Sequence, residues 1–246
     1  MNSYTICKNC ASDFRGIYCP TCKQPANTAR ITWNELGHHA IHAFLHVDRG
    51  FLYTVSEMFV RPGKTIQNYF EGKRGYHFNP FFFLILLGGI TSVLFSAFHI
   101  NVIVKKVLTE SIEKVNPFFA HKHFTIIGAV ILLFLTLTDF IFYRKKKYTL
   151  PELLVSNAFQ IGEMLLFLIL SLPFLYLQNY INDKYDFDFE IRYIILCFFY
   201  CYLFFVRYQI YYSKPNYVLI VKIIFQLILL GAVVQYRIAT SIIENL

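Results

Sequence analysis

The amino-acid sequence predicts an all-α integral membrane protein of about five transmembrane helices, with a small cysteine-rich domain at its N-terminus. Hydrophobic residues make up 56% of the 246 residues and charged residues only 15%, against about 25% in an ordinary soluble protein. Several apolar runs are long enough to cross a bilayer, which takes about 20 residues each. Two CxxC pairs lie close together near the start of the chain.

The cysteine-rich domain is predicted to cover residues 1–30. Its two pairs, Cys7-x-x-Cys10 and Cys19-x-x-Cys22, form the ligand set of a four-thiolate zinc ribbon. The segment between the pairs is expected to form a hairpin that turns near Arg15-Gly16. Two disulfides or a CxxC redox centre are the alternatives, and a cytosolic location favours structural Zn²⁺ over disulfides. Four sulfur ligands leave no open coordination position, so the pattern does not favour catalysis at the metal.

Residues 31–79 are predicted to form cytosolic amphipathic or interfacial helices. Thr32-x-x-Glu35 is a capping box, which predicts a helix that runs to about Val47. At helical spacing, one face carries a carboxylate and several imidazoles that can hold a second metal ion or a proton. The alternative is a solvated polar face. The residues of this predicted second site are Glu35, His38, His42 and His46.

The stretch from Arg61 to Leu84 is where the chain is expected to enter the membrane. Pro62-Gly63 predicts a helix break, followed by a short helix over 64–71 that ends at Gly72 in a left-handed conformation. Lys73 and Arg74 then precede Pro80, which suits the first turn of a membrane helix. The two basic residues either set orientation at the lipid headgroups or form a specific headgroup or phosphate site.

Residues 80–246 are predicted to form the membrane domain. Pro173 falls inside the third predicted span, where a kink is expected. The predicted spans are residues 80–100, 124–143, 159–180, 191–212 and 218–236.

The distribution of positive charge predicts the orientation in the membrane. Sixteen of the 23 Lys and Arg residues lie before the first span, between the second and third, or around the connection between the fourth and fifth. Because Lys and Arg collect on the cytoplasmic side, we expect the N-terminus in the cytoplasm and the C-terminus outside. This role also explains the net charge of +8, so nucleic acid is not an expected partner.

Several polar residues within or near the predicted spans are candidates for function, because such residues are costly in lipid. We expect Asp139, Arg207 and Lys222 to lie near the inner interface, where their side chains reach the headgroups. Glu163 is the best candidate for an inward-facing polar site. Gln226 is the fifth polar candidate. Cys197 and Cys201, one turn apart, are interpreted as small buried residues rather than metal ligands.

The motifs described above resemble an uncharacterised bacterial membrane family, domain of unknown function 3667. The resemblance covers residues 5–100 and includes CKNCASDFRGIYCPTCKQP, HVDRGFLYT and RPGKTIQNYFEGKRGYHFNPFFFL. One departure is Lys23, because such domains more often have glycine after the last cysteine. The resemblance implies a multi-pass protein of the bacterial inner membrane and implies no activity.

Three functions compete at this point. The first is a binding or scaffold protein, not an enzyme, whose ribbon engages a protein partner while the helices contact lipid. The second is a small-solute transporter or channel subunit, in which Glu163 lies near the path and a homo-oligomer completes it. The third is a membrane enzyme acting on lipid, for which no nucleophile–base motif is present.

Overall fold

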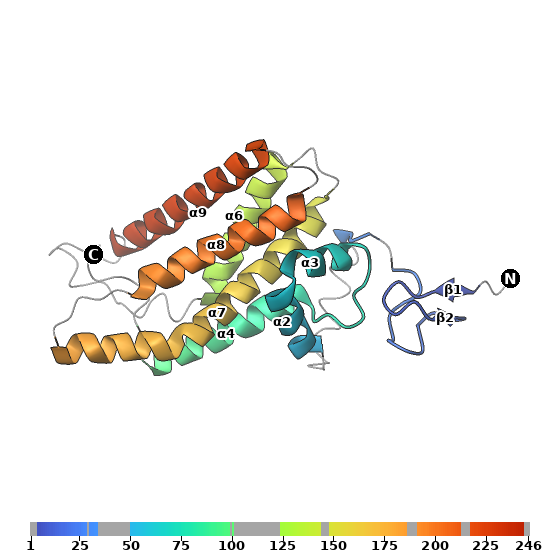
Figure 1. Ribbon diagram of the computed structural model, residues 1–246, viewed down its shortest axis with the longest axis horizontal. Coiled ribbons are helices and arrows are strands. Elements are labelled where there is room, and N and C mark those ends of the chain that lie inside the picture. Colours follow the sequence, from blue (N-terminus) through green and yellow to red (C-terminus); the bar gives the residue numbers. More distant parts are fainter. Residues whose placement is uncertain are drawn as a thin grey trace.

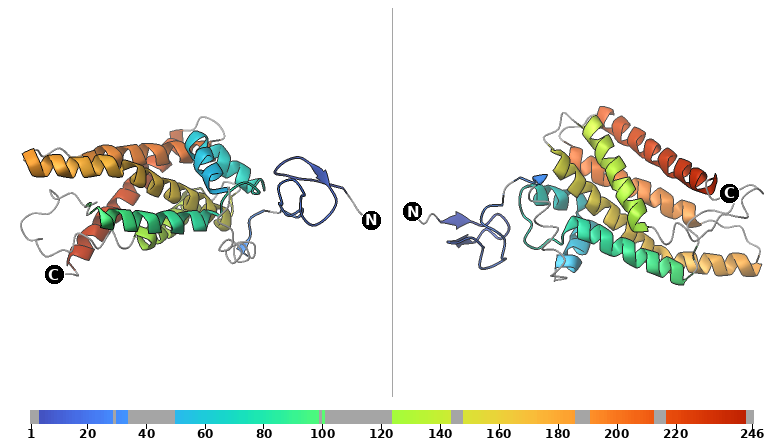
Figure 2. Two further views of the ribbon diagram at one scale, coloured as in Figure 1. Left: turned by 90° about the horizontal axis from the view of Figure 1, so that it is seen from below. Right: turned by 180° about the vertical axis from the view of Figure 1, so that it is seen from behind.

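The computed structural model describes residues 4–28, 30–33, 50–98, 100, 124–143, 148–185, 191–212 and 217–243. A bundle of long helices forms the body of the molecule, and the cysteine-rich domain extends from one end of it (Figures 1 and 2). The bundle consists of α4 (Pro80–Ala97), α6 (Phe124–Phe142), α7 (Leu150–Tyr185), α8 (Ile191–Tyr211) and α9 (Tyr217–Ile243). The fold is therefore the predicted helical membrane domain with a small N-terminal domain.

Four of these helices are long and apolar enough to cross a membrane. They correspond to the first four predicted spans, and their crossing segments are Pro80–Ala97, Phe124–Phe142, Leu150–Ile181 and Tyr193–Tyr211. The fifth predicted span lies in α9, whose apolar segment Tyr217–Ala232 is shorter. The outer surface of the bundle exposes large apolar side chains, as a lipid-facing surface does; among them are Ile85, Val93, Leu133, Phe174, Phe205 and Ile228.

Helix α7 begins nine residues earlier than the predicted third span. Pro151 lies in its first turn, and the Glu152 carboxylate accepts a hydrogen bond of 2.8 Å from the backbone N–H of Thr149. These two features start the helix at Leu150. The prediction placed the start at Phe159. The polar residues of the preceding turns, Glu152, Ser156 and Asn157, are buried in the bundle, so these turns belong to the helix. Pro173 lies within the helix, as expected.

Two short helices, α2 (Gly50–Val60) and α3 (Pro62–Phe70), lie beside the bundle at the end near the cysteine-rich domain (Figure 1). The predicted break after Val60 and the left-handed Gly72 are confirmed, but the short helix covers Pro62–Phe70 rather than residues 64–71. Pro62 opens α3, and Gly72 follows its end with a left-handed φ of +95°. The Asn79 side chain accepts hydrogen bonds from the backbone N–H groups of Phe81 and Phe82 and so caps α4.

Helix α3 packs closely against the last turn of α8. The backbone N–H of Gly63 donates to Oε1 of Gln209 at 3.0 Å, and Nε2 of Gln67 donates to the Gln209 carbonyl at 3.1 Å. A Cβ at Gly63 would lie 2.3 Å from Cβ of Gln209, so a larger residue would force the two helices apart. The interfacial helices are therefore joined to the bundle by specific contacts.

The connections of the bundle alternate between its two ends. Arg30 forms an ion pair of 2.7 Å with Glu152, which places the start of α7 at the end near the cysteine-rich domain. The Lys222 ammonium donates to the Phe142 carbonyl at 3.0 Å and brings the end of α6 beside α9. The Tyr148 hydroxyl, just before α7, donates to the Ile210 carbonyl near the end of α8. This alternation is what consecutive membrane spans require.

Candidate metal centre and intramembrane polar cluster

The cysteine-rich domain consists of two small antiparallel pairings, and each encloses one CxxC motif. Strand β1 (Thr5–Ile6) pairs with β2 (Asp13–Phe14) around the first motif. A bridge between Tyr18 and Pro25 encloses the second. The predicted hairpin within residues 11–18 is therefore wrong. Instead, Asp13 and Phe14 pair with β1 across the first CxxC turn, and Tyr18 pairs with Pro25 across the second. The chain still changes direction at Gly16, whose φ is +131°.

The two CxxC turns have the same backbone geometry. The Cys7 carbonyl accepts from the N–H of Ala11 at 2.9 Å, and the Cys19 carbonyl accepts from the N–H of Lys23 at 2.8 Å. Ala11 and Lys23 have left-handed φ values of 57° and 61°. Each turn thus directs its two sulfur atoms to the same side. Ala11 and Lys23 both carry a Cβ, although glycine adopts this left-handed conformation more easily.

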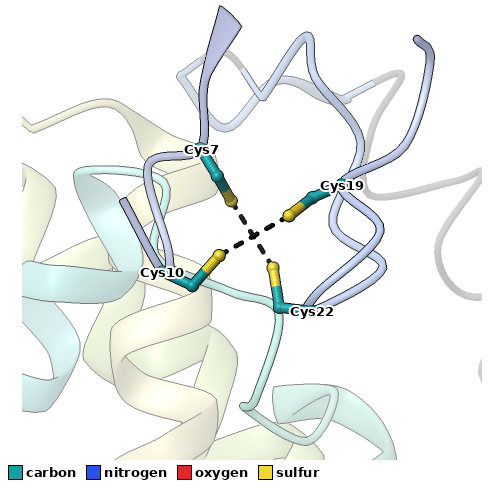
Figure 3. A group of neighbouring side chains, drawn as sticks. All are labelled: Cys7, Cys10, Cys19 and Cys22. Carbon is teal, nitrogen blue, oxygen red and sulfur yellow. Dashed lines mark hydrogen bonds between the residues drawn. The ribbon is translucent and has the colours of Figure 1, made fainter. Parts of the chain in front are cut away.

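The four sulfur atoms converge on one point (Figure 3). Sγ of Cys7 lies 3.4 Å from Sγ of Cys22, Sγ of Cys10 lies 3.5 Å from Sγ of Cys19, and all four lie within 4.8 Å of one another. A tetrahedral ion with metal–sulfur bonds of about 2.3 Å holds its sulfurs about 3.8 Å apart. The cysteines are not joined as disulfides. The donor set therefore fits a single tetrahedrally coordinated metal ion.

Ser12 supports two of the sulfur atoms. Its hydroxyl lies 3.0 Å from Sγ of Cys10 and 3.2 Å from Sγ of Cys19. Hydrogen bonds from the Ser12 side chain and backbone lower the pKa of the Cys10 thiol. Because metals bind the thiolate form, this contact favours the state that a metal-bound site needs.

Replacing Lys23 by glycine is expected to stabilise the cysteine-rich domain by about 1 kcal/mol, because glycine adopts a left-handed φ without the Cβ penalty. The measurement is the chelator concentration at which the full-length protein loses half of its metal, which should rise. Lys23→Ala is the matched control, since it removes the charge but keeps the Cβ. An equal gain from Lys23→Ala would show that the side chain, not the backbone, limits stability.

A glutamine joins the cysteine-rich domain to the loop that precedes α4. Gln24 is buried, and its Nε2 donates to the Gly72 carbonyl at 2.8 Å. Its Oε1 accepts from the backbone N–H groups of Arg74 and Gly75 at 3.0 and 2.8 Å. Sequence reasoning did not predict this contact. The signal in the sequence was the position of Gln24 directly after the second CxxC turn. We refer to these three hydrogen bonds as the Gln24 latch.

The side chains of Lys73 and Arg74 make contacts within the protein. Nζ of Lys73 lies 3.0 Å from Oδ1 of Asn68 and 3.1 Å from a carboxylate oxygen of Glu71. Nε of Arg74 donates to the Tyr69 carbonyl at 3.0 Å, and the guanidinium lies over the Tyr69 ring. Both residues thus brace the loop against α3. A headgroup or phosphate site at these residues stays a prediction.

The loop also buries a histidine that the sequence did not single out. His77 packs against the rings of Tyr53 and Tyr69, at centroid distances of 5.1 and 5.9 Å. Burial lowers the pKa of His77 to about 4. His77 is therefore neutral at physiological pH and serves as a packing residue here. The histidines of the predicted second metal site, together with Glu35, lie outside the described residues.

Four helices of the bundle meet at a fully buried polar cluster, which we define as Asp139 (α6), Asn157 (α7), Arg207 (α8) and Gln226 (α9). The guanidinium of Arg207 forms an ion pair with Asp139 and also donates to Oε1 of Gln226 at 2.8 Å. Its other terminal nitrogen donates to Oδ1 of Asn157 at 3.0 Å. The charge of Arg207 is thus met by a group from each of the other three helices.

Asp139 is the common acceptor of the cluster. Besides Arg207, it accepts hydrogen bonds from Nδ2 of Asn157 at 2.8 Å and from Nε2 of Gln226 at 2.7 Å. Buried ionised groups persist only when paired and hydrogen-bonded in this way. Because each of the four helices supplies one member of the cluster, the cluster fixes the relative positions of α6, α7, α8 and α9.

This cluster corrects two interpretations made from the sequence. Asp139 and Arg207 were expected to reach the headgroups, but both side chains have 0% exposure. They turn inward because each supplies the charge that the other lacks in lipid. Cys197 and Cys201 were interpreted as buried, but both are exposed on α8. Their thiols lie on the apolar outer surface, where a small, weakly polar group is tolerated.

Glu163 lies on α7 in the interior of the bundle. It follows Asn157, which belongs to the cluster, and is one helical turn beyond Gln160. It has no exposed surface. Among the described residues, neither of its carboxyl oxygens has a hydrogen-bond partner. This separates it from Glu152 on the same helix, whose carboxylate is paired with Arg30.

Comparison with known proteins supports one part of the resemblance. No curated protein and no solved structure matches the chain. Residues 48–91 comprise α2, α3, the loop held by the Gln24 latch and much of α4. The four cysteines and helices α6 to α9 lie outside this range. Residues 48–91 match the model of the family described as "Protein of unknown function (DUF3667)", which confirms the resemblance for this part of the chain.

Proposed function

We propose that this protein is a membrane-anchored binding or scaffold protein whose N-terminal ribbon holds one structural Zn²⁺ and docks a cytosolic protein partner. Four cysteine donors in tetrahedral arrangement favour zinc among the common single metal ions. All four coordination positions are taken by sulfur, so the ion contributes folding energy rather than a reactive site. The charge distribution supports an orientation with the ribbon in the cytoplasm, and the family resemblance is the basis for proposing a bacterial inner membrane.

The observation that carries the proposal is the exposed apolar surface of this very small domain. Tyr4, Ile6, Ile17 and Tyr18 are 68%, 67%, 76% and 63% exposed. A domain that buries so little apolar surface gains nothing for its own stability from four further exposed large side chains. Exposed apolar groups gathered on one small domain mark an interaction surface.

The charge around this surface indicates the chemistry of the partner. Arg15 stacks on the Tyr4 ring, with its guanidinium 3.9 Å from the ring centroid, and Lys23 is exposed on the second CxxC turn. Positive charge on the same small domain as these apolar side chains fits a partner with an apolar surface bordered by carboxylates. The Gln24 latch and the Arg30–Glu152 ion pair hold the domain on the bundle, so the partner is brought to the membrane.

Replacing Ile17 by glutamate is expected to abolish partner binding without loss of metal or membrane insertion, because it puts a negative charge on the apolar surface. The measurement is photo-crosslinking in cells from a benzoylphenylalanine at Tyr18. We expect one protein adduct of discrete mass, absent in Ile17→Glu and retained in Asn27→Glu, an exposed control on the same domain. Adducts to lipid or to a second copy of the chain, or an adduct that persists in Ile17→Glu, would contradict the proposal.

A further inference from the structure

Helix α7 carries a continuous buried polar stripe into the membrane. Glu152, Ser156, Gln160 and Glu163 follow one another at intervals of four, four and three residues, so they lie on one face of the helix. Glu152 is 3% exposed and the other three are 0% exposed. The stripe extends over about 16 Å at 1.5 Å per residue. A buried polar face on a membrane helix is costly and indicates a function.

The two ends of the stripe have opposite surroundings. The Glu152 carboxylate accepts two hydrogen bonds from Arg30 and one from the backbone N–H of Thr149. Between the ends, Nε2 of Gln160 donates to Oγ of Ser156 at 3.0 Å. Both carboxyl oxygens of Glu163, at the inner end, have no hydrogen-bond partner among the described residues. One carboxylate of the stripe is thus compensated, and the other is not.

No positively charged side chain within the described part of the chain is paired with Glu163. On the α4 side, the Phe83 ring packs so closely on Gly162 that a Cβ there would lie 2.3 Å from it. On the α8 side, Tyr202 lies in the neighbourhood of Glu163, and its buried hydroxyl also has no hydrogen-bond partner among the described residues. The buried cation Arg207 is already paired with Asp139. An ionised Glu163 would therefore be an uncompensated charge in a low-dielectric interior.

We propose that Glu163 is a proton-binding site within the membrane, reached along the polar stripe of α7 from the end that carries the ribbon. A neutral carboxyl group removes the uncompensated charge and adds an O–H donor. The site has an acceptor for that donor one turn away, since Oε1 of Gln160 also lacks a hydrogen-bond partner among the described residues. One proton therefore corrects both the charge and the hydrogen bonding.

A bound proton fits this site better than a bound metal cation. Hard cations in proteins are surrounded by several oxygen ligands. Among the described residues, Glu163 belongs to no cluster of three or more His, Cys, Asp or Glu side chains that could hold a metal ion, and neither of its carboxyl oxygens has a hydrogen-bond partner. The inference is independent of the ribbon and its partner. A proton site at this depth is the feature that a proton-coupled solute transporter would use.

Infrared spectroscopy of the full-length protein in lipid tests this proposal. At neutral pH we expect the carbonyl stretching band of a protonated carboxylic acid, and a shift of this band in D2O if the stripe admits solvent protons. Glu163→Gln should remove the band, and Glu163→Asp should shift it while keeping it. Glu152→Gln is the matched control: it removes the other buried carboxyl of the stripe, which is paired with Arg30, and should leave the band unchanged.

Two results would overturn the proton site, and a third would overturn the route to it. If wild type and Glu163→Gln have identical spectra in the carboxylic acid region at neutral pH, Glu163 is ionised. If added Na⁺ or K⁺ abolishes the band at constant pH in wild type, the site binds a metal cation instead. A band that is present but does not shift in D2O would contradict the route along α7, because the proton would be sealed from solvent.

Discussion

Replacement of Arg207 by methionine is expected to destabilise the bundle by about 3–5 kcal/mol, which is the usual result of removing one partner from a buried ion pair. Asp139 would remain fully buried with its negative charge and only the amides of Asn157 and Gln226 as donors. Asp139→Leu should have a similar effect, because it leaves the Arg207 guanidinium without a counter-charge. Thermal unfolding of the purified full-length protein in detergent measures both losses.

The double variant Asp139→Leu with Arg207→Met is expected to be more stable than either single variant, because no uncompensated charge is left. It should still be less stable than wild type, since two buried amides lose hydrogen-bond partners at about 1–3 kcal/mol each. Lys222→Met is the control, because this ammonium lies at the end of the bundle and, among the described residues, donates its hydrogen bond to the Phe142 carbonyl. Additive losses from the two single changes would mean that the pair does not act as a unit.

Replacement of Cys19 by serine is expected to unfold the N-terminal domain and leave the bundle intact. About thirty residues bury too little apolar surface to fold alone, and a structural zinc ion supplies on the order of 10 kcal/mol. Elemental analysis should find one zinc per wild-type chain and none in the variant. Trypsin should then cleave faster after Arg15 and Lys23, which are both exposed, because unfolding frees the backbone around them. In the folded domain the N–H of Lys23 is bonded to the Cys19 carbonyl.

Cys201→Ser is the matched control for the loss of zinc, because Cys201 lies exposed on α8 and outside the four-sulfur cluster. It should keep one zinc per chain and the wild-type tryptic pattern. Membrane-fraction blots should show normal insertion for both serine variants. Zinc retained in Cys19→Ser, or wild-type protein purified without chelator and free of zinc, would contradict a four-cysteine zinc site.

The sequence was sufficient wherever short-range chemistry determines the structure. The CxxC spacing brings the four sulfurs together because each turn is only a few residues long. Pro62, Gly72 and the Asn79-Pro80 pair mark helix ends through their own backbone preferences. The positions of most spans follow from hydropathy for the same reason, since lipid accepts long apolar segments regardless of their neighbours.

The polar cluster could not be predicted, because its members are spread over four helices. In the sequence, each member stands as an isolated polar residue in or near an apolar segment; the members are Asp139, Asn157, Arg207 and Gln226. Lipid and helix partners are similarly apolar, so periodicity does not distinguish the inward face of a membrane helix from the outward one. The same limitation explains why α7 was started too late and why Cys197 and Cys201 were placed inside. Only the packed structure shows which polar groups find each other.

The Gln24 latch has a consequence for how this architecture can vary. The amide of Gln24 lies two residues after Cys22, the last of the four clustered cysteines, yet it satisfies three backbone groups of a loop within residues 48–91. The segment that matches the family model thus borrows part of its own hydrogen bonding from a domain outside that match. A natural or designed chain that keeps this loop but lacks the ribbon must provide a substitute for one donor and one acceptor. Grafting the loop alone, without such a side chain, would leave Gly72 and Gly75 with unsatisfied backbone groups.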